Sequence, residues 1–304
     1  MASDKLKGHA ALWGANVIWG LNAPIAKSVL DNVSAFAMTS YRMVGACLLF
    51  WTASLFLPRE RVGRRDLAMI FFASLFGIQL NQMLFLYGLS MTSPVDTSII
   101  ATVVPVLTMI FATLFLREPV TLLKVSGVAL GAAGAVLLVF SGRGDDAGAA
   151  SGVWGDVLCI ASTVSYAIYL TAFRDTVVKY HPVTSMKWMF LFAAACSLCI
   201  YNRPLLSVDY AALPADVYAG IAYVVIGSTF MSYLLVPIGQ RYLRPTLVSM
   251  YNYLQPVVAV VCTVLAGMDT FSAADAVAAL CIFTGVWLVT KSKSRAQLEA
   301  ELRN

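Results

Sequence analysis

Apolar residues dominate this chain in long stretches that short polar segments interrupt. A helix needs roughly 20 apolar residues to cross a bilayer. Ten stretches approach that length, at about 10–29, 35–57, 67–90, 94–116, 124–141, 153–173, 184–201, 217–238, 245–268 and 273–290. Helices of a soluble core would be surrounded by helices with long polar faces, and the sequence has none. The pattern therefore predicts an all-α integral membrane protein with ten transmembrane helices.

The second half of the chain repeats the first in its placement of proline and glycine. With an offset of 151 residues, Gly88 aligns with Gly239 and Pro105 aligns with Pro256, among other pairs. These residue types constrain the backbone in ways that aliphatic residues do not. Because each half holds five spans, an odd number, the second half must cross the membrane in the opposite direction. We therefore predict two inverted five-helix repeats.

The segments between the spans suggest the boundaries of these units. We expect a first repeat over residues 1–141, a linker over 142–152, a second repeat over 153–291 and a cytoplasmic tail over 292–304. The linker is rich in Gly, Asp and Ala, which is typical of a flexible connection. The first stretch lacks a strong small-residue cleavage site and takes part in the repeat, so we expect a helix rather than a cleaved signal peptide.

Composition and charge refine this picture. The chain has 304 residues, of which 60% are hydrophobic and only 12% are charged, and its mean hydropathy is +0.78. If the N-terminus is cytoplasmic, 17 of the 21 Lys and Arg residues lie on the inner side. The positive-inside rule then places both termini in the cytoplasm and the protein in the plasma (inner) membrane. The net charge of +5 comes from these short loops, which argues against nucleic-acid binding.

Patterns typical of catalysis or of metal and cofactor sites are missing from the sequence. It contains no Gly-rich phosphate loop, nucleophile elbow or paired carboxylates at a usable depth. Cys196 and Cys199 lie in an apolar stretch without nearby histidines, so their spacing does not indicate a metal site. We expect a protein that is not an enzyme and that needs no cofactor or metal.

Several segments together resemble a known family. They are Trp19-Gly20-Leu21-Asn22 followed by Lys27, the stretch 88–94, and the run from Pro105 to Arg117-Glu118-Pro119. In order, spacing and duplication they resemble the drug/metabolite transporter superfamily, specifically its EamA-type ten-helix members, over nearly the whole chain. The second half departs from the pattern, with Tyr166-Ala167 in place of Trp19-Gly20. The resemblance implies an exporter or exchanger of small metabolites, with a central cavity formed chiefly by helices three, four, eight and nine.

Polar residues occur where such a cavity would lie. Gln79 and Gln82 fall roughly 18–22 Å along the third span, near mid-membrane, and at this spacing they share one helical face, whereas Asn81 points elsewhere. An amide that faced lipid would cost several kcal/mol, so we expect both glutamines to face the interior. The alternative role for each is a hydrogen bond between helices.

Two prolines of the repeat predict interruptions in the fourth and ninth spans. Pro105 leaves the carbonyl of Ala101 without its helical donor, and Pro256 does the same to Asn252. Freed carbonyls at membrane depth need partners from protein or water. We expect Pro105 and Pro256 to act as hinges beside the cavity, and the alternative is a static kink.

Aromatic side chains complete the candidate site. They offer apolar faces and phenol hydroxyls suited to a neutral or zwitterionic organic solute, although core packing is the commoner role of such residues. The candidate substrate-binding residues are Trp19, Asn22, Gln79, Gln82, Tyr87, Tyr166, Tyr251 and Asn252.

Charged residues within the spans are few. Arg42 and Asp96 lie near the outer ends of the second and fourth spans, and we expect them to form an ion pair, because a buried arginine is costly without a partner. The competing role of Arg42 is recognition of a substrate carboxylate. The eighth to tenth spans contain no Lys or Arg, which argues against phosphorylated substrates.

These features predict a transporter rather than a scaffold, because the short loops offer little soluble surface. The expected function is export or facilitated transport of small neutral or zwitterionic organic metabolites, such as amino acids, by alternating access. A channel-like facilitator and a proton-coupled antiporter, with Asp96 as the titratable group, are the alternatives. The expected partners are the solute and membrane lipid, and a monomer is compatible with the sequence.

Overall fold

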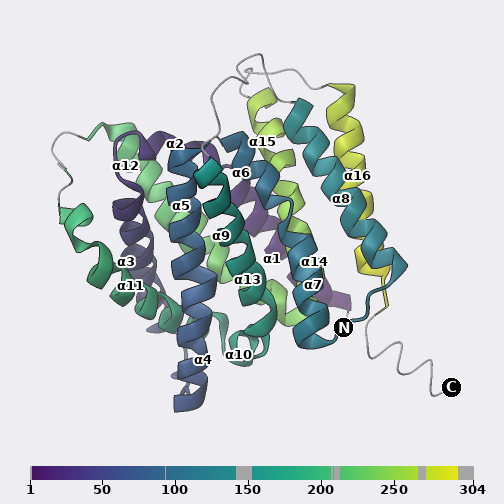
Figure 1. Cartoon of the computed structure of the whole chain (residues 1–304). Coiled ribbons are helices and arrows are strands. Elements are labelled where there is room, and N and C mark those ends of the chain that lie inside the picture. Colours follow the sequence, from purple (N-terminus) through teal and green to yellow (C-terminus); the bar gives the residue numbers. More distant parts are fainter. Residues whose placement is uncertain are drawn as a thin grey trace.

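The computed structural model describes residues 2–92, 94–141, 153–206, 208, 213–265 and 272–293, and the regular elements within them are helical (Figure 1). The first half contains α1 (Ala2–Gly20), α2 (Asn22–Leu30), α3 (Ala35–Ser54), α4 (Arg64–Ser74), η1 (Leu75–Leu80), α5 (Asn81–Met91), α6 (Pro94–Ala101), α7 (Val104–Leu116) and α8 (Leu122–Ser141). The second half contains α9 (Val153–Ala172), α10 (Arg174–Lys179), α11 (Pro182–Leu206), α12 (Ala215–Ala222), η3 (Tyr223–Met231), α13 (Ser232–Tyr242), α14 (Pro245–Met250), η4 (Tyr251–Tyr253), α15 (Leu254–Leu265) and α16 (Ala273–Lys291).

Six helices of the described chain are long and apolar enough to cross a membrane. They cover Arg64–Met91, Ile99–Leu116, Val153–Ala172, Pro182–Ile200, Ala215–Tyr242 and Ala273–Lys291. These helices overlap the third, fourth, sixth, seventh, eighth and tenth of the predicted spans. The all-helical class is therefore confirmed for the described residues, and the six apolar helices are consistent with an integral membrane protein. The ten spans and the inverted repeats stay predictions.

Large apolar side chains cover much of the outer surface. Leu280 and Trp287 on α16 and Leu122 at the start of α8 are exposed, while Ser228, Gln240 and Ser249 are fully buried. A soluble protein of this size would bury the first group and expose the second. The distribution fits a protein whose outer surface contacts lipid and whose polar groups face its interior.

Four helix pairs join the two halves, and each pair is antiparallel. In α8 and α16, Gly127 lies against Gly285 while Gly134 lies against Ala278, so the numbers run in opposite directions along the contact. In both places a Cβ on the α8 glycine would meet a backbone oxygen at 2.7 Å, so only glycine permits this approach. Figure 1 shows α8 and α16 side by side. The pairs α3 with α11, α1 with α13 and α5 with α9 join the halves in the same way.

The fourth and ninth predicted spans are each interrupted before their proline. The chain turns at Thr102–Val103 between α6 and α7, two residues before Pro105. Between α14 and α15, residues Tyr251–Tyr253 form a short 3₁₀ turn before Pro256. The predicted interruptions are therefore present at matching positions of both halves.

Wide helical turns occur at a second matching pair of positions. The backbone is π-helical over Leu75–Leu80, between α4 and α5, and again over Tyr223–Met231, between α12 and α13. Such turns are rare and are found disproportionately at functional sites. They interrupt the third and eighth predicted spans near mid-length, beside the cavity described next.

Candidate functional site

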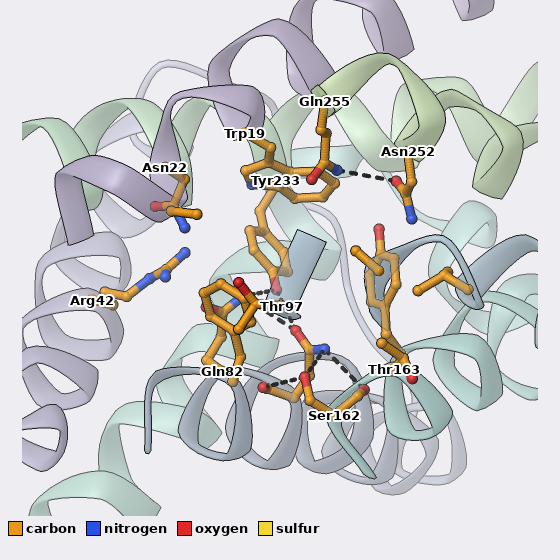
Figure 2. Close-up of a pocket in the computed structure, with 16 residues that line it drawn as sticks. Trp19, Asn22, Arg42, Gln82, Thr97, Ser162, Thr163, Tyr233, Asn252 and Gln255 are labelled. Carbon is orange, nitrogen blue, oxygen red and sulfur yellow. Dashed lines mark hydrogen bonds between the residues drawn. The ribbon is translucent and has the colours of Figure 1, made fainter. Parts of the chain in front are cut away.

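A cavity of about 130 Å³ lies between the two halves of the molecule (Figure 2). Both halves contribute to its wall, through α1, α2, α3, α5, α6 and α7 of the first half and through α9, α13, η4 and α15 of the second. The lining residues are Trp19, Asn22, Ala23, Arg42, Asn81, Gln82, Phe85, Thr97, Ala101, Val104, Ser162, Thr163, Tyr166, Tyr233, Asn252 and Gln255.

The hydroxyl of Tyr233 is the centre of a hydrogen-bond network on one wall. It donates to the carbonyl of Gly77 at 3.1 Å and accepts a hydrogen bond from Nε2 of Gln82. Asn81 accepts from the same Gln82 amide at 3.3 Å and donates to Oγ and the carbonyl of Ser162. The network links α5 of the first half to α9 and α13 of the second, so buried amides and hydroxyls fix the relative positions of the halves.

Aromatic rings form the wall beside this network. The indole of Trp19 packs edge-on against Tyr166 and Tyr233, with centroid distances of 6.1 and 5.8 Å. Its Nε1 donates to the carbonyl of Ser228 at 2.8 Å, within the π-helical segment η3. This bond holds the ring in one orientation, so the cavity presents rigid apolar faces between polar groups.

The π-helical turns supply backbone acceptors to the opposite half. The carbonyl of Gly77 in η1 accepts from Tyr233, and that of Phe76 accepts from Oγ of Ser165 at 2.7 Å. In η3 the carbonyl of Ser228 accepts from Trp19. A regular α-helix would use these carbonyls within itself. At the wide turns these carbonyls also accept hydrogen bonds from side chains of the opposite half.

The helix interruptions bring two further groups to the cavity. Ala101 is the last residue of α6, and Asn252 lies in the 3₁₀ turn η4, so both residues with proline-freed carbonyls line the cavity. Oδ1 of Asn252 accepts from Gln255 Nε2 at 3.5 Å, and that Nε2 also donates to Asn16 Oδ1 at 3.0 Å.

Arg42 lies at the cavity wall with an arrangement that differs from the expected one. Its Nε donates to Oγ1 of Thr229 at 2.8 Å, and its Nη2 to Oγ of Ser228 at 3.4 Å. Among the described residues it forms no ion pair, so the expected pair with Asp96 is wrong for this structure. Asp96 instead accepts a hydrogen bond from Oγ1 of Thr92 at 3.4 Å. The hydroxyls that reach Arg42 belong to η3, whose wide turn was not expected.

Five of the eight expected substrate-binding residues line the cavity, and three do not. Those that line it are Trp19, Asn22, Gln82, Tyr166 and Asn252. Tyr87 is 39% exposed and packs against Phe36, with ring centroids 5.2 Å apart. Tyr251 is buried away from the cavity, where its hydroxyl bonds to Nδ1 of His9. Gln79 is buried but lies outside the lining.

The displacement of Gln79 has a physical cause in the backbone. The expectation that Gln79 and Gln82 share a face assumes a regular helix, with about 100° of rotation per residue. Gln79 lies in the π-helical segment η1 and Gln82 in the α-helix that follows. The wider turn changes the rotation between them, and Asn81, expected to point elsewhere, reaches the cavity beside Gln82.

Several lining residues were not among the expected binding residues. They are Asn81, Thr97, Ser162, Thr163, Tyr233 and Gln255. A signal for them exists in the sequence, since each is a polar or phenolic side chain within an apolar stretch. Single hydroxyl residues in such stretches often bond only to their own helix, so this signal does not identify a cavity.

Polar contacts between the halves gather at the end of the molecule where the predicted cytoplasmic loops lie. Asp66 on α4 pairs with Lys179 and accepts from the hydroxyl of Tyr180. This carboxylate raises the pKa of Lys179, mainly through the hydrogen bond between them. Farther along, Glu118 accepts from Lys124 at 2.7 Å and from Thr246 at 3.1 Å. These contacts hold the two halves together at this end.

Comparison with known proteins supplies independent information. The profile of the EamA-like transporter family matches residues 6–140 and again residues 153–291. An uncharacterized transporter of Archaeoglobus fulgidus is 27% identical over 218 residues, covering 71% of this chain and 74% of that protein. A WAT1-related protein of Arabidopsis thaliana is 26% identical over 275 residues, covering 81% of this chain and 68% of that protein. A solved crystal structure matches the fold with a TM-score of 0.75 at 21% identity, covering 95% of this chain and 97% of that one.

Proposed function

The chain belongs to the EamA-like transporter family. We propose that this membrane transporter carries small neutral or zwitterionic organic solutes, such as amino acids, through the central cavity by alternating access. The observation that carries the proposal is a polar cavity whose wall is divided between the two halves. A site shared in this way changes its exposure when one half rocks against the other.

The antiparallel helix pairs support an inverted relationship between the halves. A two-fold axis in the membrane plane requires equivalent helices to run in opposite directions. The equivalent pairs α3 with α11 and α8 with α16 do so, as Gly127 facing Gly285 and Gly134 facing Ala278 illustrate. In this proposal the interruptions before Pro105 and Pro256 are the hinges about which the repeats move.

The size and chemistry of the cavity support a small solute. Sites for drug-sized ligands have volumes of about 300–1,000 Å³, and this cavity is smaller, at about 130 Å³. Its described lining combines amides, hydroxyls, aromatic rings and the guanidinium of Arg42, and within it we find no carboxylate or imidazole. We therefore propose facilitated transport or exchange, without a titratable proton site in the cavity.

The contacts at one end support an assignment of the conformation. Asp66 with Lys179 and Glu118 with Thr246 join the halves at the end where the predicted cytoplasmic loops lie. We propose that this structure represents the state closed to the cytoplasm. Opening that side would then require both contacts to break.

Counterflow in proteoliposomes tests the proposal. Vesicles loaded with unlabelled amino acid should transiently accumulate the labelled form, and the rate should saturate, because a carrier binds its solute in each cycle. Gln82→Leu and Asn252→Leu should lower this rate at least about tenfold, since each removes a hydrogen-bonding group from the wall at similar bulk. Gln79→Leu is the matched control on the same span, and its rate should stay near that of the unmodified protein.

Two results would contradict the proposal. Flux that rises in proportion to solute concentration, without counterflow, would indicate a channel. An equal loss of transport in Gln79→Leu and Gln82→Leu, at equal membrane abundance, would show that the cavity wall is not the solute path.

A further inference from the structure

We propose that the transported solute carries a carboxylate and that Arg42, together with Asn22, binds this group in the central cavity. The inference rests on the proposed function and specifies the class of solute for the same site. Arg42 is the only ionised side chain of the described lining, and it is 1% exposed.

The charge of Arg42 is not neutralised by the described parts of the protein. Its two hydrogen bonds go to the neutral hydroxyls of Thr229 and Ser228. Among the described residues, Arg42 forms no ion pair. A buried guanidinium without a counter-ion is strongly unfavourable in a membrane protein. An anionic group on a bound solute would supply the missing charge.

The guanidinium also retains a free donor. Its Nη1 is buried and has no hydrogen-bond partner among the described residues. The bonds of Nε and Nη2 hold the planar group in place, which leaves Nη1 aligned for an incoming acceptor. Arginine binds carboxylates well because its fork of donors matches their two oxygens.

Asn22 adds a second donor beside this position. Figure 2 shows the side chains of Arg42 and Asn22 pointing toward one another from α3 and α2, with the amide nitrogen on the side of the guanidinium. Asn22 is also buried. Two neighbouring donor groups without an acceptor between them are suited to an oxygen anion.

A single cation favours a monoanion over a phosphate dianion. Binding of phosphate groups usually uses several positive or backbone donors together, and the described lining offers one arginine. The aromatic wall of Trp19, Tyr166 and Tyr233 would then contact the rest of the solute. The solute class is therefore a small organic carboxylate, which includes α-amino acids.

Matched sets of ligands test this inference on the unmodified protein. Each set is built on the side chain of alanine, serine, leucine or phenylalanine and contains the amino acid, its amide, the corresponding amine and the deaminated carboxylate. Thermal unfolding of the purified protein in detergent measures binding, because a ligand of the folded state raises its apparent stability. At least one amino acid or deaminated acid should stabilise the protein, and its amide and amine should bind at least about tenfold more weakly.

Variants then locate the recognition. Arg42→Gln should weaken binding of the stabilising carboxylate at least about tenfold, while Arg42→Lys, which keeps the charge but loses the fork, should fall between. Lys27→Gln is the control, since it removes another half-buried cation whose Nζ bonds the carbonyls of Leu89 and Thr92 outside the cavity. The ligand sets applied to the unmodified protein decide the question even if an Arg42 variant does not fold.

The outcomes separate this inference from the proposed function. Saturable counterflow of solutes that lack a carboxylate, or equal stabilisation by an amide and its acid, would overturn the role of Arg42 and leave the transporter intact. Stabilisation by no carboxylate of any set would also overturn the inference. Loss of saturable counterflow for every solute tested would contradict the proposed function itself.

Discussion

The buried pair of Lys124 and Glu118 provides a quantitative test of how the closed end of the molecule is held. Lys124 is fully buried, and its Nζ lies 2.7 Å from Oε2 of Glu118, which also accepts from Thr246 in the second half. Lys124→Met would leave a buried carboxylate with one hydroxyl partner, and Glu118→Leu would leave a buried ammonium. Each single change should lower the free energy of unfolding by about 3–5 kcal/mol.

The double variant Lys124→Met/Glu118→Leu removes both charges and should cost only about 0–2 kcal/mol, because apolar groups of similar volume can replace a buried pair. The two single changes, if independent, would instead add. The exposed pair of Lys7 and Asp4, with side chains 62% and 46% exposed and 3.5 Å apart, is the control. Its removal should change stability by about 0–1 kcal/mol.

Reversible unfolding in mixed micelles, with increasing dodecyl sulfate and circular dichroism as the signal, measures each free energy. Single variants that cost less than about 1 kcal/mol, or a double variant as unstable as the sum of the singles, would show that Lys124 and Glu118 are not a coupled buried pair. The same double variant also tests the cytoplasm-closed assignment. Loss of the Glu118 contact with Thr246 should favour the open state and change the exchange rate without abolishing folding.

Three further predictions concern topology, hinges and the cavity wall. In a background without native cysteines, Arg64→Cys and Arg244→Cys should react with an impermeant thiol reagent only from the cytoplasm. Asn32→Cys and Asp216→Cys should react only from outside. Reaction of positions 64 and 32 from the same side would contradict the topology. Pro256→Ala should slow solute exchange while equilibrium solute binding persists, because a continuous helix disfavours one access state. An unchanged rate of solute exchange would argue against a hinge at Pro256. Tyr233→Phe removes the hydroxyl that donates to the carbonyl of Gly77 and should lower the free energy of unfolding by about 1–3 kcal/mol. The control Tyr87→Phe, at an exposed tyrosine, should change the free energy of unfolding by less than about 0.5 kcal/mol. Equal effects of the two changes would contradict the hydrogen-bond network.

Much of the fold could be predicted from the sequence because membrane spans need long apolar runs. Such runs identify helices such as α9 and α16 with little ambiguity. The interruptions before Pro105 and Pro256 were also predictable, since proline removes a backbone donor wherever it occurs. The π-helical turns η1 and η3 carry no comparable residue signature, because their wide turns depend on packing between the halves.

The candidate site was predictable only in part for the same reason. Trp19, Asn22, Gln82, Tyr166 and Asn252 lie at the cavity because polar and aromatic groups within spans face the interior. Assigning individual faces fails where helical rotation changes, as at Gln79. Partners of Arg42 could not be inferred either, because Ser228 and Thr229 reach it only from the wide turn of η3.

In the proposed mechanism, one cavity between the two halves is exposed to each side of the membrane in turn. A single cysteine that replaces Thr163, a cavity residue on α9, reports this exposure in sealed vesicles of known orientation. We expect an impermeant thiol reagent to modify this cysteine from either side, and we expect transported solute to protect it from both. Modification from one side only, in a protein that still performs saturable counterflow, would contradict alternating access through this cavity.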